Sequence, residues 1–218
     1  MKNIEPRHHH DYYRTPEWSV HRLLEEMAET LPEGMYLDPC AGDGAIMSGF
    51  ASCAHRDRGL LQTYWHALEI QEEHGPALVE HVESLQICDA LTVEWEEYEQ
   101  TPYGLIMSNP PFSLATEFLI KAITSPGDPM VVFLQRLPWL ASGDRAELMR
   151  AFPPDVYPLP NRPRFKPDSI GENGKKVHGT DVHDYSWFVW PLGNKERKAG
   201  ICKVLQATPL AERKRWEP

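Results

Sequence analysis

The 218-residue chain is short of cysteine, long apolar runs and positive charge, and each shortage excludes a class of protein. Its four cysteines stand far apart without a Cys-x-x-Cys pair, so reduced thiols are expected and a structural zinc site is not. No apolar run approaches the ~20 residues of a membrane-spanning helix. The polar, histidine-containing N-terminus is not typical of a signal peptide. We therefore expect a cytoplasmic protein with no membrane partner and no bound metal.

The shortage of positive charge is confined to one half of the chain. The net charge is −10, which by itself disfavours a nucleic-acid partner. Residues 1–100 hold 20 acidic and 6 basic residues, whereas residues 101–218 hold 12 acidic and 16 basic residues. A local positive patch can bind phosphates while the rest of the surface is acidic, with a modest and salt-sensitive affinity. The expected nucleic-acid-binding residues are Arg136, Arg162, Arg164, Lys166, Lys175 and Lys176.

Apolar strand patterns alternate with helical patterns along the chain. Strands are expected at residues 35–37, 63–70, 85–88, 105–108, 130–134, 185–190 and 201–206, and helices at 17–29, 45–53, 76–83, 115–123 and 145–150. This alternation predicts an α/β fold with a mainly parallel, doubly wound sheet. The last two strands are predicted to form an antiparallel pair at its edge.

One region breaks the alternation. Residues 153–180 are rich in proline, glycine and charge, and are too long for an ordinary connection, which indicates a functional loop or a partly disordered segment. The length of the chain suits one domain with a full core. We expect a single domain over residues 1–218, in which residues 153–184 form a long loop region that faces the target.

The sequence Asn109-Pro110-Pro111-Phe112 follows an apolar run that is typical of a buried strand. Two consecutive prolines cannot extend a strand and carry no N–H donor, so they form a stiff turn. The turn stands at the carboxyl end of the strand, where open α/β sheets bind their ligands. An exocyclic amine can donate to the Asn109 side-chain oxygen and to the Pro110 carbonyl, and Phe112 can stack on the ring that carries the amine. A strand-ending turn without chemistry is the alternative interpretation.

Polar residues also end the other expected parallel strands. Residues 38–44 form a glycine-rich turn in which the backbone can pass close to a ligand, and the P-loop signature is absent. Asp38 can attract a cationic group of a ligand. Glu69 can take ribose hydroxyls, as in dinucleotide-binding sheets, and Asp89 can accept from an adenine amine. Glu69, Asp89 and Asn109 follow one another at intervals of 20 residues, the length of one strand–helix unit.

These motifs resemble those of S-adenosylmethionine (SAM)-dependent amino methyltransferases, and the chain resembles the small N6-adenine DNA methyltransferases of phages and prophages. Residues 38–44 match the SAM-binding motif, and residues 109–112 match the catalytic motif. Residues 11–16 resemble a Tyr-x-Thr-Pro element that contacts the SAM carboxylate. Residues 162–165 and 184–190 resemble late segments of the same phage group. The likeness covers residues 11–206.

The resemblance implies a Rossmann-like class I methyltransferase that transfers the methyl group of SAM to the N6 amine of adenine in DNA. The target adenine would be flipped out of the duplex or presented in a single strand. The implied catalytic residues are Asn109, Pro110, Pro111 and Phe112. The implied cofactor-binding residues are Tyr13, Thr15, Pro16, Asp38, Pro39, Cys40, Ala41, Gly42, Gly44, Glu69, Asp89, Ala90 and Asn109.

Two departures from the family and three alternative functions qualify this expectation. No distinct target-recognition domain is present, so a short or relaxed sequence specificity is expected. The family often has Tyr where this chain has Phe112, which stacks but offers no hydroxyl. RNA adenine and protein-glutamine methyltransferases also use Asn-Pro-Pro-aromatic, although the protein enzymes usually have Tyr and lack Tyr-x-Thr-Pro. A non-catalytic SAM-fold interaction protein would be expected to lose Asn109 or the glycines. The resemblance ranks the DNA enzyme first, in the cytoplasm of a phage-infected or prophage-carrying bacterium.

Overall fold

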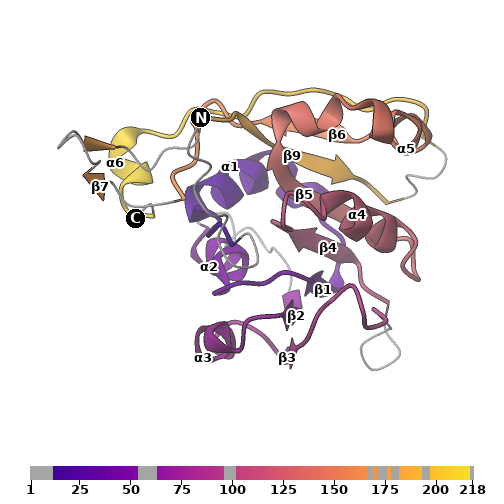
Figure 1. Cartoon of the computed structure of the whole chain (residues 1–218), viewed down its shortest axis with the longest axis horizontal. Coiled ribbons are helices and arrows are strands. Elements are labelled where there is room, and N and C mark those ends of the chain that lie inside the picture. The colour runs from indigo at the N-terminus through magenta and orange to yellow at the C-terminus, as the bar shows by residue number, and fades with distance from the viewer. Residues whose placement is uncertain are drawn as a thin grey trace, which may run out of the picture.

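The computed structural model describes residues 12–53, 63–95, 102–165, 169–170, 176–177, 182–192 and 197–216. Their main feature is a seven-stranded sheet of order β3-β2-β1-β4-β5-β9-β6 (Figure 1). Its strands are β1 Gly34–Asp38, β2 Thr63–Glu69, β3 Ser84–Ile87, β4 Leu105–Ser108, β5 Met130–Arg136, β6 Asp155–Pro158 and β9 Tyr185–Trp190. A separate antiparallel pair consists of β7 Ser169–Ile170 and β8 Lys176–Val177.

Helices connect the strands on both faces of the sheet. They are α1 Glu17–Met27, α2 Ala45–Ser52, α3 Gly75–Leu78, α4 Ala115–Ile123, α5 Ala146–Ala151 and α6 Leu210–Arg213, with 3-10 turns η2 Ala28–Thr30, η4 Glu72–His74, η5 Leu137–Leu140 and η6 Gly143–Arg145. In Figure 1, α1 and α2 lie on one side of the sheet and α4 and α5 on the other. Among the described residues, no helix is long and apolar enough to cross a membrane.

The strand directions confirm the expected mainly parallel, doubly wound sheet. β3, β2, β1, β4 and β5 are parallel to one another, and β9 runs antiparallel to both β5 and β6. The chain builds β1, β2 and β3 outward in one direction and then returns to place β4 on the other side of β1. This reversal separates the loops that leave the carboxyl ends of β1 and β4, and such a switch point is where open α/β sheets bind ligands.

Successive side chains along each strand point to opposite faces of the sheet, which divides the core into two layers. Tyr36 on β1 and Met107 on β4 pack in one buried cluster with Trp18 of α1. Their strand neighbours Leu37 and Ile106 are in the other buried cluster, which also contains apolar side chains of α4. Because both faces of β4 are buried, its sequence is apolar at every position up to Ser108, as is typical of central parallel strands.

The structure corrects two expectations at the antiparallel edge. The expected loop from residue 153 onward is wrong for residues 155–158, which form β6, because a proline is tolerated in an edge strand. The expected pairing of residues 201–206 with β9 is also wrong. β6 is the partner of β9, and residues 201–205 lie along the outer side of β6, where Val156 N donates to Ile201 O at 2.8 Å and Lys203 N donates to Val156 O at 2.9 Å. The helix expected over residues 76–83 is shorter and ends at Leu78.

Candidate active site

A cavity of about 530 Å³ opens at the carboxyl ends of β1, β2, β3 and β4. This volume is within the usual range for small-molecule and cofactor sites. Most of the cofactor-binding residues expected from the sequence line it, namely Tyr13, Thr15, Asp38, Pro39, Cys40, Ala41, Gly42, Glu69, Asp89, Ala90 and Asn109. Pro111 of the Pro-Pro turn lines it as well. The structure therefore brings together residues from five separate segments of the chain, as the topology rule for open sheets requires.

The glycine-rich turn forms the floor of this cavity. Gly42 has φ +55° and Gly44 has φ +84°, a left-handed conformation that glycine adopts at little cost. A Cβ at Gly42 would lie 2.6 Å from the Tyr12 ring, so this position is closed to larger residues by packing as well. Gly44 does not line the cavity. Its left-handed conformation starts α2, and its role is to turn the chain into the helix.

Asp38 ends β1 at the bottom of the cavity and is 1% exposed. Its Oδ1 accepts hydrogen bonds from the Ser108 hydroxyl at 2.7 Å and from the Cys40 N–H at 3.0 Å. Its Oδ2 is buried and has no hydrogen-bond partner among the described residues. Burial raises the pKa of Asp38 from 3.8 to about 7, and the two hydrogen bonds oppose this rise. Such a carboxylate is stabilised by a cationic group that enters the cavity.

Glu69 is the last residue of β2, whereas Asp89 stands two residues after the end of β3, and the two carboxylates are held differently. Glu69 is buried, and its carboxylate accepts from Gly42 N at 2.7 Å and from Gln71 N at 2.8 Å. It thus fixes the glycine-rich turn, and each carboxylate oxygen retains capacity for a further donor. Asp89 is exposed, and its Oδ1 accepts from Leu91 N at 2.9 Å. Glu69 is therefore pre-organised by backbone donors, whereas Asp89 borders the cavity at the surface.

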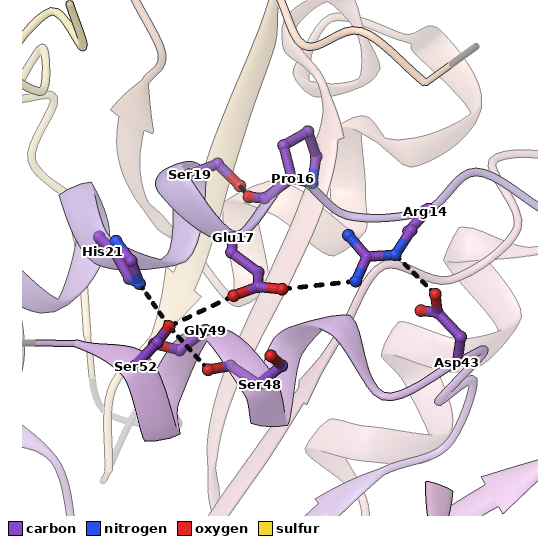
Figure 2. A network of polar contacts seen from close by, with 9 residues as sticks. All are labelled: Arg14, Pro16, Glu17, Ser19, His21, Asp43, Ser48, Gly49 and Ser52. Atoms are coloured by element: carbon purple, nitrogen blue, oxygen red, sulfur yellow. Dashed lines mark hydrogen bonds and ion pairs between the residues drawn. The ribbon is translucent and has the colours of Figure 1, made fainter. Parts of the chain in front are cut away.

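The segment before α1 crosses the cavity and joins its two sides. Arg14 Nε lies 2.6 Å from Asp43 Oδ2 in the glycine-rich turn, and Arg14 Nη2 lies 3.4 Å from Glu17 Oε1. Figure 2 shows Arg14 between these two carboxylates, with Glu17 directed toward Ser52 of α2. The Ser52 hydroxyl is 3.3 Å from Glu17 Oε2. This network fastens the start of α1 to the turn and to α2, so the segment is held over the cavity.

The same segment orients the side chain of Asn109. Asn109 Nδ2 donates to the Tyr13 backbone carbonyl at 2.9 Å and to Thr15 Oγ1 at 3.1 Å. A backbone carbonyl can only accept, so the nitrogen of the Asn109 amide must be the atom that faces Tyr13. Asn109 Oδ1 is then directed elsewhere, and it is buried with no hydrogen-bond partner among the described residues. The site thus contains a fixed acceptor at the cavity wall that lacks a donor.

Aromatic side chains gather beside Asn109. The Phe112 ring stacks with Tyr13 at a centroid distance of 5.4 Å and an interplanar angle of 20°. It also lies 5.6 Å from the Tyr185 ring, and Phe165 makes edge contacts with Tyr13 and Tyr185. The Arg136 guanidinium lies over Phe112 at 4.6 Å from the ring centroid. This is a cation–π contact, which holds the Arg136 guanidinium against the face of the ring.

The structure distributes the expected basic residues unevenly. Two of them lie beside the aromatic side chains. The Arg136 guanidinium contacts the Phe112 ring, and Arg164 directly precedes Phe165 in the chain. Arg162 is exposed, and its Nε lies 2.8 Å from an exposed carboxylate oxygen of Asp184. An exposed pair of this kind contributes little to stability and separates readily. Lys166 and Lys175 lie outside the described residues, and the structure describes only the backbone of Lys176.

Several site residues were missed by the sequence reasoning. Arg14 and Asp43 line the cavity as an ion pair, although their positions within the two motifs gave no sign of the pairing. Tyr185 and Phe165 stand in segments that the resemblance marked without assigning them a role. Gln135 donates from Nε2 to the Pro110 carbonyl at 3.2 Å. A buried polar residue near the end of the apolar strand β5 was the available signal for this contact.

Comparison with solved structures identifies the fold. A Listeria monocytogenes protein assigned to the class I SAM-dependent methyltransferases matches 93% of this chain and 70% of its own length, with a TM-score of 0.62 and 14% identity. The type I restriction-modification methyltransferase subunit of Streptococcus thermophilus matches 93% of this chain but 52% of its own length, with a TM-score of 0.63 and 13% identity. A Pyrococcus horikoshii protein assigned as an RNA methyltransferase matches 84% of this chain and 88% of its own, with a TM-score of 0.54 and 15% identity.

No family model and no curated protein sequence matches this chain. The likeness is therefore one of structure at low sequence identity, and the chain spans about half the length of the streptococcal subunit. The fold of this chain is the Rossmann-like fold of these class I methyltransferase structures.

Proposed function

We propose that this chain transfers the methyl group of SAM to the N6 amine of adenine in DNA, with a short or relaxed sequence specificity. The observation that carries the proposal is the orientation of Asn109. Its nitrogen is fixed by Tyr13 O and Thr15 Oγ1, and its oxygen is a buried acceptor without a donor at the wall of the cavity. A primary amine on an aromatic ring supplies the donor that this oxygen lacks.

The residues of the cavity fit SAM. The unpartnered Oδ2 of Asp38 suits the ammonium of the methionine moiety, and Glu69 beside it retains acceptor capacity for ribose hydroxyls. Among the described residues, four carboxylates line the cavity together with one cation, Arg14, which is paired with Asp43. Because SAM carries no phosphate, this lining matches its charge better than that of a nucleotide. When bound, SAM supplies an electrophilic methyl group on a sulfonium. The burial of Asp38 and the packing of Tyr12 on Gly42 restrict the access of water to this part of the cavity.

The chain's own groups would prepare the acceptor amine. One amine hydrogen donates to Asn109 Oδ1 and the other to the Pro110 carbonyl, which draws the nitrogen toward a tetrahedral geometry and makes its lone pair available. Holding the two reactants in this arrangement supplies much of the rate enhancement. Burial raises the pKa of the Cys40 thiol well above its ordinary value, and the Asp38 carboxylate adds to this effect. Cys40 therefore stays protonated, and we propose a direct transfer without a covalent enzyme intermediate. The amine nitrogen would take the methyl group as the bond between the methyl carbon and the sulfonium sulfur breaks, and the methylated amine would release one proton to solvent.

The DNA substrate is supported by the surroundings of Asn109. A flipped adenine would enter among Phe112, Tyr13 and Phe165, where base–aromatic stacking contributes about 1–3 kcal/mol per base. Arg136 and Arg164 stand beside these rings and would contact phosphates. The motif resemblance of residues 11–16 and 184–190 supports the further proposal of a phage or prophage enzyme that acts in a bacterial cytoplasm.

An acceptor panel tests the proposed function. The purified chain is incubated with methyl-labelled SAM and with single-stranded DNA, duplex DNA, RNA or a glutamine-containing protein, and the modified residue is identified by mass spectrometry. We expect N6-methyladenine in DNA and no label in protein. Label in RNA adenine or in glutamine amide would redirect the proposal to one of the two alternative acceptors. Absence of label from every acceptor, together with intact SAM binding, would favour a non-catalytic protein.

A further inference from the structure

A buried glutamine near the end of β5 holds the catalytic turn. Gln135 is 1% exposed, and its Nε2 donates to the Pro110 carbonyl at 3.2 Å. The contact follows from the sheet register, because β5 pairs with β4 up to Ser108 and Phe133. Two residues beyond this pair, Pro110 and Gln135 stand beside each other at the same edge of the sheet.

The orientation of the Gln135 amide is fixed by chemistry. The Pro110 carbonyl can only accept, so the nitrogen of Gln135 must face it. The other end of the amide, Oε1, is buried and has no hydrogen-bond partner among the described residues. A buried polar group without a partner costs about 1–3 kcal/mol, so an apolar side chain of similar length would suit this core position better for stability alone. The bond to Pro110 is the feature that an apolar side chain would lose.

The Pro-Pro turn has little means of holding its own carbonyl. Proline carries no N–H, so neither residue of the turn can donate to a neighbouring carbonyl. Gln135 supplies a donor from the adjacent strand. A carbonyl oxygen has two lone pairs, and one of them remains for a second donor while Gln135 occupies the other. The Pro110 carbonyl can therefore be fixed in direction and still accept a hydrogen from a substrate amine.

We propose that Gln135 is a positioning residue for methyl transfer, which fixes the Pro110 carbonyl so that it accepts one hydrogen of the acceptor amine while Asn109 accepts the other. This inference rests on the proposed function. Gln135 does not line the cofactor cavity, so its effect falls on turnover and not on SAM affinity. Misplacement of a reactive group by about 1 Å can cost roughly a hundredfold in rate.

Two variants separate positioning from simple packing. Gln135→Met keeps the length of the side chain and removes the donor, so kcat should fall by about tenfold to a hundredfold at saturating SAM and DNA. The SAM Kd and the melting temperature should stay close to the wild-type values. Gln135→Glu keeps the shape but donates only when its carboxyl is protonated. Its kcat relative to wild type should be highest at low pH and should fall by tenfold or more as the carboxylate forms.

The matched control is Gln86→Met, since Gln86 is exposed on the edge strand β3. This variant should leave kcat unchanged at every pH. A wild-type chain that methylates no adenine acceptor would defeat the proposed function and this inference with it. If the wild-type chain methylates adenine, two results would overturn the positioning role alone. One is full kcat in Gln135→Met, and the other is a ratio of Gln135→Glu kcat to wild-type kcat that does not change with pH. The positioning role is also overturned if Gln135→Met lowers the affinity for SAM and leaves kcat unchanged.

Discussion

Protonation of Asp38 should govern both the binding of SAM and part of the stability of the fold. The folded-state pKa of this buried carboxyl is raised from 3.8 to about 7. A bound ammonium favours the ionised carboxylate, so below pH 7 the site must release a proton when the cofactor binds. The apparent Kd for SAM should therefore rise by about tenfold for each pH unit below 7 and become independent of pH just above 7.

Asp38 contributes a pH dependence to the free energy of unfolding that is opposite in sign to that of an acidic residue whose pKa is lowered on folding. Because the pKa is raised on folding, the folded state binds more protons than the unfolded state between pH 4 and pH 7. The free energy of unfolding in the absence of cofactor should then decrease as pH rises through this window, and the contribution should be constant above it. A pKa shift of one unit corresponds to about 1.36 kcal/mol, so the free energy of unfolding should change by on the order of 4 kcal/mol across this window.

Isothermal titration with SAM or its demethylated product between pH 5.5 and 7.5 tests this account, because the ligand ammonium stays protonated below its pKa of about 7.7–8.0. Asp38→Asn is the matched variant, since it keeps the shape and cannot ionise. We expect weak, pH-independent binding by the variant, and a free energy of unfolding that no longer falls across this window. A wild-type Kd that is constant from pH 5.5 to 7.5 would refute the role given to Asp38.

Four further changes follow from the geometry. Gly42→Ala should weaken SAM binding and lower the melting temperature, because its Cβ would meet the Tyr12 ring at 2.6 Å at a φ of +55°; titration and calorimetry measure both. Thr15→Val should lower kcat by a few-fold at an unchanged melting temperature, since it removes one of the two acceptors that orient Asn109. Arg14→Gln breaks a half-exposed ion pair at 2.6 Å and should cost at most about 1 kcal/mol of stability, while raising the SAM Kd. Replacing Arg162 and Arg164 by Gln should flatten the salt dependence of DNA binding by up to about two units of slope, and an unaltered slope would exclude phosphate contacts by these residues.

The sequence predicts the site where a single rule places its residues. Asp38 and Glu69 are the last residues of β1 and β2, and Asn109 directly follows β4. The carboxyl ends of these parallel strands meet at one edge of the sheet. The hydrogen bonds that join these residues to distant segments could not be predicted, because local patterns do not show which segments meet. Glu69 accepts from Gly42 N, and Asn109 donates to Tyr13 O, which is 96 residues away.

The antiparallel edge was predicted less well for a physical reason. β6 contains a proline and lies in a proline-rich region, so its sequence resembles a loop, and it forms a strand because β9 offers an open edge to pair with. The contact of Gln135 with Pro110 likewise depends on the register of β5 against β4, which local sequence patterns do not specify. Both features therefore depend on how strands pair in the folded sheet, which the local sequence does not specify.

The most direct test of the central claim compares wild type with Asn109→Ala in a single turnover on adenine-containing DNA. N6-methyladenine is measured by mass spectrometry, and SAM affinity is measured in parallel. If Asn109 Oδ1 is the acceptor for the target amine, the variant should form no detectable N6-methyladenine while its SAM Kd stays within a few-fold of wild type. Undiminished N6-methyladenine formation by Asn109→Ala would contradict the account.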